Sequence, residues 1–227
     1  MITILLDSSN TNLSVGIARD NLLLDYISYE AWQQQSEFMI PELDKLLKKY
    51  DVDKNDIGEV IVAKGPGSYT GVRIAITIAK TIATALNAKL YAISSLRVQK
   101  DCKNPSICLI NARSGRSYIG VYQDDQILLE DQIMKNDEVL NYIKEHPDYS
   151  VCGDTKYLGI EGIQSNNIQE MLNLKSAVES INPLSLKPVY KCHSGSATTE
   201  SHREVPTQQE KENSFYKRGE TEVGGLW

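Results

Sequence analysis

The sequence predicts an α/β protein of two lobes, and three observations support this fold class. Before residue 100, apolar runs and amphipathic stretches alternate in the order βββαβαβ, which is typical of a mixed sheet with helices packed on it. A fresh strand pattern begins at Ser106. The 227 residues, 41% hydrophobic and 24% charged, are enough for a sizeable core. We therefore expect lobes at residues 1–100 and 101–190, followed by a disordered tail at 191–227.

Three strands open the first lobe. Residues 2–6 are apolar and lead into the polar turn 7–12. Apolar and small residues then alternate over 13–17, and 22–29 is another extended stretch. Tight polar turns between neighbouring strands predict an antiparallel meander.

Two helices and two strands complete this lobe. A helix is predicted to begin near Ser36, because apolar residues then recur at steps of three and four up to Tyr50. Residues 60–63 form a buried strand, a glycine-rich loop spans 65–71, and a long helix extends to about Leu86. The next strand is expected at 90–93.

The second lobe is expected to be smaller. Strands are predicted at 106–110, 118–122 and 149–152, with a turn at 111–115, a helix at 137–145 and an amphipathic segment at 168–180. Residues 193–222 are rich in Ser, Thr, Glu, Gln and Lys and nearly lack aliphatic side chains. Such a segment has too little apolar surface to fold, so we expect it to be disordered.

Charge and composition limit the location and the partners. The formal charge is 24 − 30 = −6, so a phosphate backbone is repelled on average and direct tRNA binding is not expected. No signal peptide or membrane-spanning stretch is apparent, and the four cysteines lack a C-x-x-C pair. We expect a cytoplasmic protein without membrane contact, cofactor or metal, whose thiols are reduced.

Two segments could hold a phosphate group. Asp7-Ser8-Ser9 ends the first strand and presents an acid and hydroxyls, although the same residues are common in ordinary turns. Gly65 to Gly71 feeds a helix N-terminus that Thr70 could cap, and its glycines allow positive φ and close backbone approach. No G-K-S/T follows, so it is not a P-loop, and a tight strand-to-helix connection is the alternative. The candidates for a residual phosphate site are Asp7, Ser8, Gly65 and Gly67.

The long helix is apolar on nearly all sides. Ala75, Ala79 and Ala83 recur every four residues beside a parallel row of isoleucines, which permits close approach of another helix. Either the fold covers this helix twice or a partner covers it. We predict a partner interface on both helices, at Met39, Leu43, Leu46, Ala75, Ala79 and Ala83.

The sequence offers few groups for catalysis. The three histidines are His146, His193 and His202, and neither H-E-x-x-H nor G-x-S-x-G occurs. We therefore assign no catalytic residue.

Six segments, in this order, resemble motifs of the TsaB (YeaZ) family. They are similar to its Asp-Thr-Ser start, its G-P-G-S-F/Y-T-G-L/V-R-I signature with a following A-K, its S-S-L, its D-A-R with a later Tyr, its G-D turn and its P-x-Y. The matching positions are Asp7-Ser8-Ser9, Gly65–Ile74 with Ala79-Lys80, Ser94-Ser95-Leu96, Asn111-Ala112-Arg113 with Tyr118, Gly153-Asp154, and Pro188-Val189-Tyr190. Together they cover nearly all of residues 1–190.

Three positions depart from the family pattern. Gln35 replaces a frequent His, Asn111 replaces the Asp of D-A-R, and Tyr190-Lys191-Cys192 replaces Y-L-R. The first two departures argue against a metal or phosphate site that works as in TsaD, the catalytic paralogue. They leave the helices untouched.

The resemblance implies two ribonuclease-H-like lobes of the actin/Hsp70/sugar-kinase (ASKHA) superfamily. It also implies a non-catalytic subunit that supports TsaD, with TsaE as ATPase, while TsaD transfers threonylcarbamoyl from its adenylate to N6 of adenosine 37 in tRNAs reading ANN codons. In such proteins the two helices of the first lobe join TsaD or a second copy, and tRNA is met through the complex. The alternatives are a metal-dependent (glyco)protease-like enzyme and an ASKHA phosphotransferase.

Overall fold

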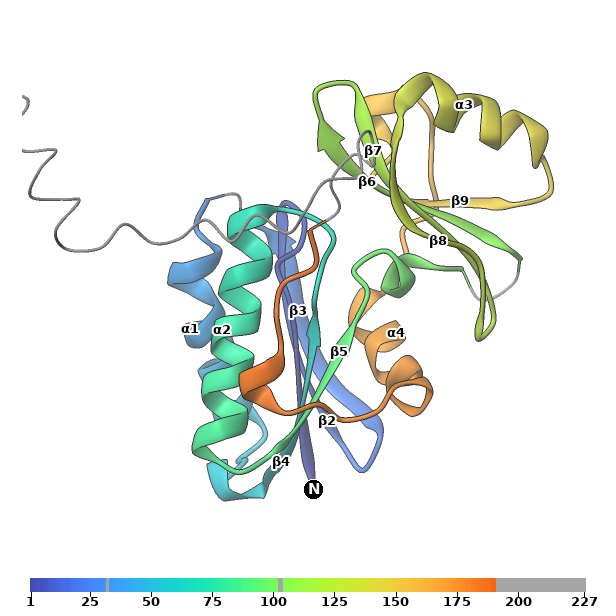
Figure 1. Cartoon of the computed structure of the whole chain (residues 1–227). Helices are drawn as coiled ribbons and strands as arrows, with labels where there is room; N and C mark the ends of the chain where they lie inside the picture. The colour runs from blue at the N-terminus through green and yellow to red at the C-terminus, as the bar shows by residue number, and fades with distance from the viewer. Residues whose placement is uncertain (32, 102–103, 191–227) are drawn as a thin grey trace, which may run out of the picture. The chain divides into compact units, whose positions relative to one another are not determined.

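The computed structural model describes residues 1–31, 33–101 and 104–190. Its first sheet has the strand order β3-β2-β1-β4-β5 (Figure 1). The strands are β1 (Ile2–Asp7), β2 (Asn12–Arg19), β3 (Leu22–Glu30), β4 (Ile57–Ala63) and β5 (Lys89–Ile93). The meander predicted for the first three strands is confirmed, because β2 pairs antiparallel with both β1 and β3. Strands β4 and β5 extend the sheet in parallel.

The second sheet repeats the pairing of the first. Its order is β8-β7-β6-β9, with β6 (Ser106–Arg113), β7 (Arg116–Gln123), β8 (Gln126–Lys135) and β9 (Ser150–Gly153). Strand β6 is antiparallel to β7 and parallel to β9, as β1 is to β2 and β4. The two halves therefore share one topological plan, which the second follows without a fifth strand.

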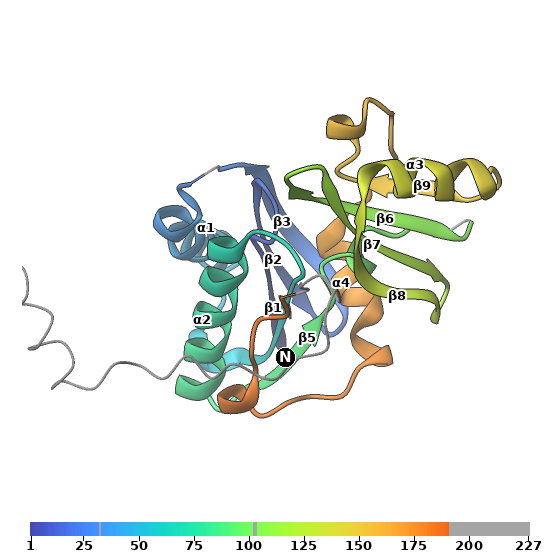
Figure 2. The ribbon, with the colours of Figure 1, turned by 45° about the horizontal axis from the view of Figure 1, so that its top comes forward.

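Helices cover both faces of the first sheet. Helices α1 (Gln35–Lys49) and α2 (Tyr69–Ala85) lie on one face, and α4 (Asn167–Asn173) lies on the other (Figures 1 and 2). Side chains alternate accordingly along β1: Ile4 and Leu6 face the first pair of helices, whereas Leu5 packs with Ile168 of α4. This double cover explains why β1 is a continuous apolar run. Helix α3 (Asn136–Glu145) packs on the second sheet.

The segment 181–190 returns to the first sheet and runs along α2, as the orange strap beside that helix in Figures 1 and 2 shows. Leu186 is buried in the same core as α2, and its carbonyl oxygen accepts a 3.2 Å hydrogen bond from Lys80 Nζ. The backbone N–H of Val189 donates to Lys64 O at 2.8 Å. The fold thus covers α2 with the sheet and with this strap.

This return corrects the expected domain division. Residues 167–190, assigned above to the second lobe, pack on the first sheet, and the described residues all belong to one compact unit. The reason is that α4 is needed to cover the second face of a sheet whose strands are apolar on both sides. A boundary between two lobes near residue 100 stays a prediction.

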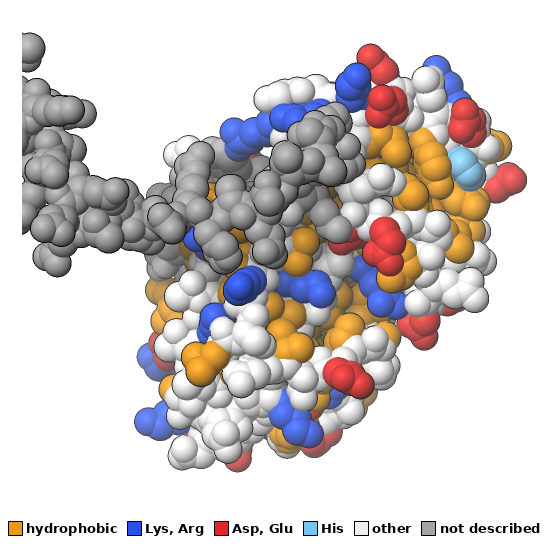
Figure 3. All heavy atoms as spheres, viewed as in Figure 1, with side chains coloured by type: hydrophobic (Ala, Val, Ile, Leu, Met, Phe, Trp, Pro, Cys, Tyr) orange, Lys and Arg blue, Asp and Glu red, His pale blue; other side chains and the backbone are white. Residues whose placement is uncertain are grey.

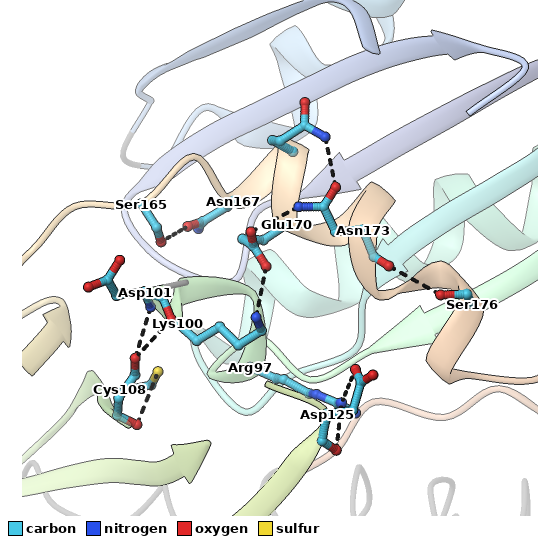
Figure 4. A network of polar contacts seen from close by, with 12 residues as sticks. Arg97, Lys100, Asp101, Cys108, Asp125, Ser165, Asn167, Glu170, Asn173 and Ser176 are labelled. Atoms are coloured by element: carbon cyan, nitrogen blue, oxygen red, sulfur yellow. Dashed lines mark hydrogen bonds and ion pairs between the residues drawn. The ribbon is translucent and has the colours of Figure 1, made fainter. Parts of the chain in front are cut away.

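Two buried ion pairs hold residues 170–175 to the rest of the fold. Lys100 Nζ lies 3.4 Å from Glu170 Oε2 of α4, as Figure 4 shows. Lys175 Nζ lies 2.7 Å from Glu59 Oε2 of β4. In the second pair, only 15% of the Lys175 side chain and 5% of the Glu59 side chain remain exposed.

The elements differ from the expectation at two places. Strand β8 was not predicted, since Ile127 and Leu128 are both exposed and break the alternation of a half-buried strand. The amphipathic segment 168–180 is helical only over α4 and then continues as a 3-10 turn, Leu174–Ala177. The tail predicted at 191–227 lies outside the described residues. Within the described part, none of the helices has the length and hydropathy needed to span a bilayer.

Candidate functional site

The glycine-rich loop joins β4 to α2, and Gly65 is enclosed at its start. Its φ is +97°, in the region that favours glycine. Its N–H donates to Ser95 Oγ at 3.0 Å, and its carbonyl accepts from Ser95 N at 3.0 Å. A Cβ at this position would lie 2.6 Å from Val189 O. The predicted positive φ is confirmed, and the residue packs under the strap.

The rest of the loop packs against the turn after β1. Ser68 N–H donates to Ser9 O at 2.7 Å, and Ser8 Oγ donates to Gly71 O at 2.8 Å. A Cβ on Gly67 would approach Ser9 O to 2.2 Å, and one on Gly71 would approach Ser8 O to 1.9 Å. The close backbone approach predicted for these glycines is present, but the neighbouring backbone belongs to the protein itself.

Asp7 is also bound within the chain. Its side chain is buried, Oδ1 accepts from Ser9 N at 2.8 Å, and Oδ2 accepts from Asn167 Nδ2 at 3.3 Å. The loop and the turn thus bring Asp7, Ser8 and Gly67 together. A phosphate site at these residues stays a prediction. The helix cap predicted at Thr70 is wrong by two residues: Ser68 is the N-cap, and its Oγ accepts from Gly71 N at 3.3 Å.

A polar cleft of about 840 Å³ opens beside this loop. The turn after β1 and the N-terminus of α2 line it together with the β6 end and its turn, the equivalent turn of the second sheet. Its lining residues include Ser9, Asn10, Thr11, Gln35, Gly67, Ser68, Tyr69, Thr70, Gly71, Asn111, Arg113, Tyr118 and Asp154. Asn10, Thr11 and Ser68 were not singled out from sequence, although Ser68 lies within the glycine-rich segment and Asn10 and Thr11 follow Asp7-Ser8-Ser9 in the same turn.

Asp154 is the cleft residue with a shifted carboxyl pKa. Burial raises the pKa above its ordinary value, although a hydrogen bond from the Asn111 backbone and the charge of Lys156 oppose this. Gln35, which stands where the family has a frequent His, is buried, and its Nε2 donates to Asn10 O at 3.3 Å. Amide, hydroxyl and charged groups of both signs therefore line the cleft, which suits hydrogen bonding to a small polar molecule.

Two motifs that are distant in the sequence meet at Tyr69, which lines the cleft. The rings of Tyr69 and Tyr190 stack with their centroids 4.9 Å apart. Arg73 Cζ lies 4.6 Å from the centre of the Tyr69 ring. The strap, which carries Tyr190, thereby brings the P-x-Y segment to the glycine-rich segment.

The predicted interface residues are placed differently from the expectation. All six side chains, Met39, Leu43, Leu46, Ala75, Ala79 and Ala83, are buried in the core that α1 and α2 form on the first sheet, with at most 5% exposed. They are corrected to core residues, because on each helix the row chosen from the sequence is the one that packs on β-strands.

Other rows of the same helices reach the surface. Ile74, Ile78 and Ile82 of α2 are half-buried and only border the core. Thr77 and Thr81 are exposed, and so is Ile40 of α1, with 48% of its surface accessible. Figure 3 shows Lys and Arg side chains interspersed with Asp, Glu and hydrophobic side chains on the face it displays, without one continuous basic stripe there.

Residues that could ligate a metal do not gather in the described part of the chain, where no three His, Cys, Asp or Glu form a group. His146 packs between Tyr142 and Tyr149. His193 and His202, like Cys102 and Cys192, lie outside the described residues.

Comparisons with known proteins give a consistent set of relatives. Residues 29–173 match the family model described as TsaD, tRNA N6-adenosine threonylcarbamoyltransferase. The tRNA threonylcarbamoyladenosine biosynthesis protein TsaB of Bacillus subtilis is 37% identical over 145 residues, which cover 62% of each chain. An uncharacterized protein of Mycoplasma genitalium is 27% identical over 79% of this chain and 88% of its own. The match thus spans less than two thirds of the Bacillus subtilis relative.

A solved structure shares the fold. YeaZ from Pseudomonas aeruginosa aligns with a TM-score of 0.69 at 19% identity, over 83% of this chain and 99% of its own. Together with the repeated strand pairing of the two sheets, this confirms the α/β fold with two sheets that the sequence predicted, while its assignment to the ASKHA superfamily stays a prediction.

Proposed function

The chain belongs to the family described as TsaD, tRNA N6-adenosine threonylcarbamoyltransferase, and within it to the TsaB (YeaZ) proteins, and we propose that it takes part in forming threonylcarbamoyladenosine in tRNA. In this role it is a cytoplasmic accessory subunit that supports TsaD and performs no transfer itself. TsaE joins the same complex, and tRNA is met through it. A homodimer through the same surface is the alternative state of the free chain.

The state of the candidate phosphate residues supports the non-catalytic part of the proposal. Asp7 and Ser8 direct their side-chain oxygens at Ser9 N, Asn167 and Gly71 O. Gly65 and Gly67 approach backbone of the chain itself. A ligand phosphate at this point would have to displace these contacts, each of which is worth about 1 kcal/mol net.

The single observation that carries the partner surface is the outer row of α2. Ile74, Ile78 and Ile82 repeat every four residues and stay half-buried, while the sheet and the strap cover two other sides of the helix. An apolar row of this kind next to exposed threonines suits helix packing against a second protein. We therefore place the contact with TsaD on the outward rows of α1 and α2.

Thr77→Arg tests this surface. Thr77 is exposed on α2, so the arginine stays in water in the free chain. In the complex it would be desolvated without a partner, at a cost of several kcal/mol, against about 8 kcal/mol for a micromolar complex. We expect co-purification with TsaD to be lost while circular dichroism is unchanged. Ser180→Arg, at an exposed position outside the helix pair, is the matched control and should bind normally.

A second measurement tests the proposed function separately from the proposed position of the partner surface. Threonylcarbamoyladenosine in tRNA is quantified in cells that lack the chain and in cells that carry Thr77→Arg. Unchanged modification without the chain would refute the function. Loss without the chain, but full complementation and normal TsaD binding by Thr77→Arg, would refute only the location of the surface.

A further inference from the structure

Two thiols face each other in the core of the second sheet. Cys108 of β6 and Cys152 of β9 are direct partners in the parallel register of these strands. Both are free and fully buried, and they share a small cluster with Leu96, Ile110 and Tyr122. Nothing in the proposed function uses them.

Their placement matches the geometry of a disulfide. Neighbouring strands lie about 4.8 Å apart, and residues in direct register point their side chains to the same face. Disulfides join Cα atoms that are roughly 4.4 to 6.8 Å apart. The direct register of Cys108 and Cys152 therefore puts their Cα atoms in this range and their side chains on one face of the sheet.

We propose that Cys108 and Cys152 form a reversible disulfide that staples β9 to β6 when the protein meets a hydroperoxide. Cys152 lies two residues before Asp154, which lines the cleft. Oxidation at this position therefore fixes β9, the strand that leads directly to Asp154.

Access to the thiols comes from local opening of β9. This strand is four residues long and stands at the end of the sheet. Its outer side is bridged by Ile163, whose N–H donates to Val151 O and whose side chain is 45% exposed. Short terminal strands of this kind open without global unfolding, and this exposes buried groups transiently.

The two thiols have distinct chemical roles. A hydrogen bond from the Cys108 thiol lowers the pKa of Cys152, whereas burial raises the pKa of Cys108. Thiolates are the reactive form, so the Cys152 thiolate attacks hydrogen peroxide and becomes a sulfenic acid, releasing hydroxide. Cys108 then attacks that sulfur, the S–S bond forms and water leaves. In sum, two thiols and one peroxide give one disulfide and two waters.

The test uses the full chain with Cys102 and Cys192 replaced by serine, so that the two buried thiols remain. The folded protein is exposed to hydrogen peroxide, alkylated, digested and mapped by mass spectrometry. We expect a linked pair of peptides containing Cys108 and Cys152, an intact mass lower by two hydrogens, and reversal by dithiothreitol. The linked form should keep its circular dichroism and melt at a higher temperature, because the unfolded chain is constrained.

Single-thiol variants test the roles. With Cys108→Ala in the same background, Cys152 should be trapped as a sulfenic acid by dimedone. With Cys152→Ala, Cys108 should react many-fold more slowly. Thiols that stay alkylatable through the exposure, irreversible oxidation to sulfinic acid, or a linked form without native circular dichroism would each overturn the proposal. The mapping of the two-thiol chain stands even where a single-thiol variant folds poorly.

Discussion

At the scale of single residues, Gly71 shows two opposing effects. It lies in the first turn of α2, where alanine favours the helix by about 1 kcal/mol. However, a Cβ there would lie 1.9 Å from the backbone oxygen of Ser8. That oxygen belongs to a turn held by hydrogen bonds of Asp7 and Ser9, so it has little freedom to move. The contact should therefore outweigh the propensity.

Gly71→Ala is thus expected to destabilise the protein by about 2 kcal/mol, within the range for overpacking. Urea unfolding followed by circular dichroism measures this. Gly58→Ala is the control, because its Cβ would meet only the flexible end of the Met1 side chain, and it should change stability by less than about 0.5 kcal/mol. An unchanged or raised midpoint for Gly71→Ala would show that the turn after β1 yields.

Residues were predictable from the sequence where a conformation is demanded locally. Gly65 needs its positive φ, and glycine at that position indicates it. The face of α2 that packs on the sheet was not predictable, because a row of alanines and a row of isoleucines run side by side along the helix. Either row can face a sheet, and only tertiary packing selects the alanines.

At the scale of elements, Glu59 of β4 joins three parts of the fold. Its carboxylate accepts from Thr3 Oγ1 at 2.9 Å, from Tyr91 Oη at 3.3 Å and from Lys175 Nζ at 2.7 Å. Burial by itself would raise the pKa of Glu59, but the hydrogen bonds from Lys175 and Thr3 outweigh it. The pKa therefore lies below its ordinary value of 4.5.

This shift predicts an acid-dependent contribution to stability. Because the folded pKa lies below the unfolded one, the stabilisation is fully present above pH 4.5 and is lost as the pH falls through the folded pKa. Glu59→Gln should cost stability at neutral pH, and the difference from the wild type should shrink on acidification below this value. Chemical unfolding at a series of pH values measures it. Glu161→Gln, at an exposed position, should show no such trend. A difference that stays constant with pH would contradict the ionic account.

Elements were predictable where periodicity is strong. Helices α1 and α2 and strands β1 to β7 have clear apolar patterns, and each was expected close to its position. Strand β8 has exposed apolar residues on its edge, and α4 is only seven residues long. Their stability comes from neighbours distant in sequence, such as β7 and β1, which no local pattern reports.

At the scale of the whole molecule, the chain leaves the first sheet after β5, builds the second sheet and then returns. The return is stabilised by Leu186 in the first core, by the hydrogen bond from Ile181 N to Leu90 O at 2.8 Å, and by the Tyr190 ring on Tyr69. The family motif P-x-Y therefore closes the structure. Residues 188–190 therefore have a structural role, which is to hold the end of the returning segment on the first sheet.

Two shortened chains test where the structure ends. A chain of residues 1–190 keeps the strap, and the tail it lacks has few aliphatic side chains to bury. Its thermal midpoint should stay within about 3 °C of the full chain. A chain of residues 1–180 loses the burial of Leu186 and the hydrogen bonds of Ile181, Lys80 and Val189. These contacts are worth about 4 kcal/mol together, so its midpoint should fall by roughly 10 °C.

The comparison of the two chains separates the strap from the tail. If the chain of residues 1–190 itself melts about 10 °C lower, then residues beyond Tyr190 contribute to the fold, because a fall of that size corresponds to at least ~2 kcal/mol. If both shortened chains have the thermal midpoint of the full chain, the strap adds no stability. The side of α2 that the strap covers is then stable when it is exposed to water. With the expected order, the strap is the second cover of α2, and the half-buried row of Ile74, Ile78 and Ile82 remains for the partner proposed above.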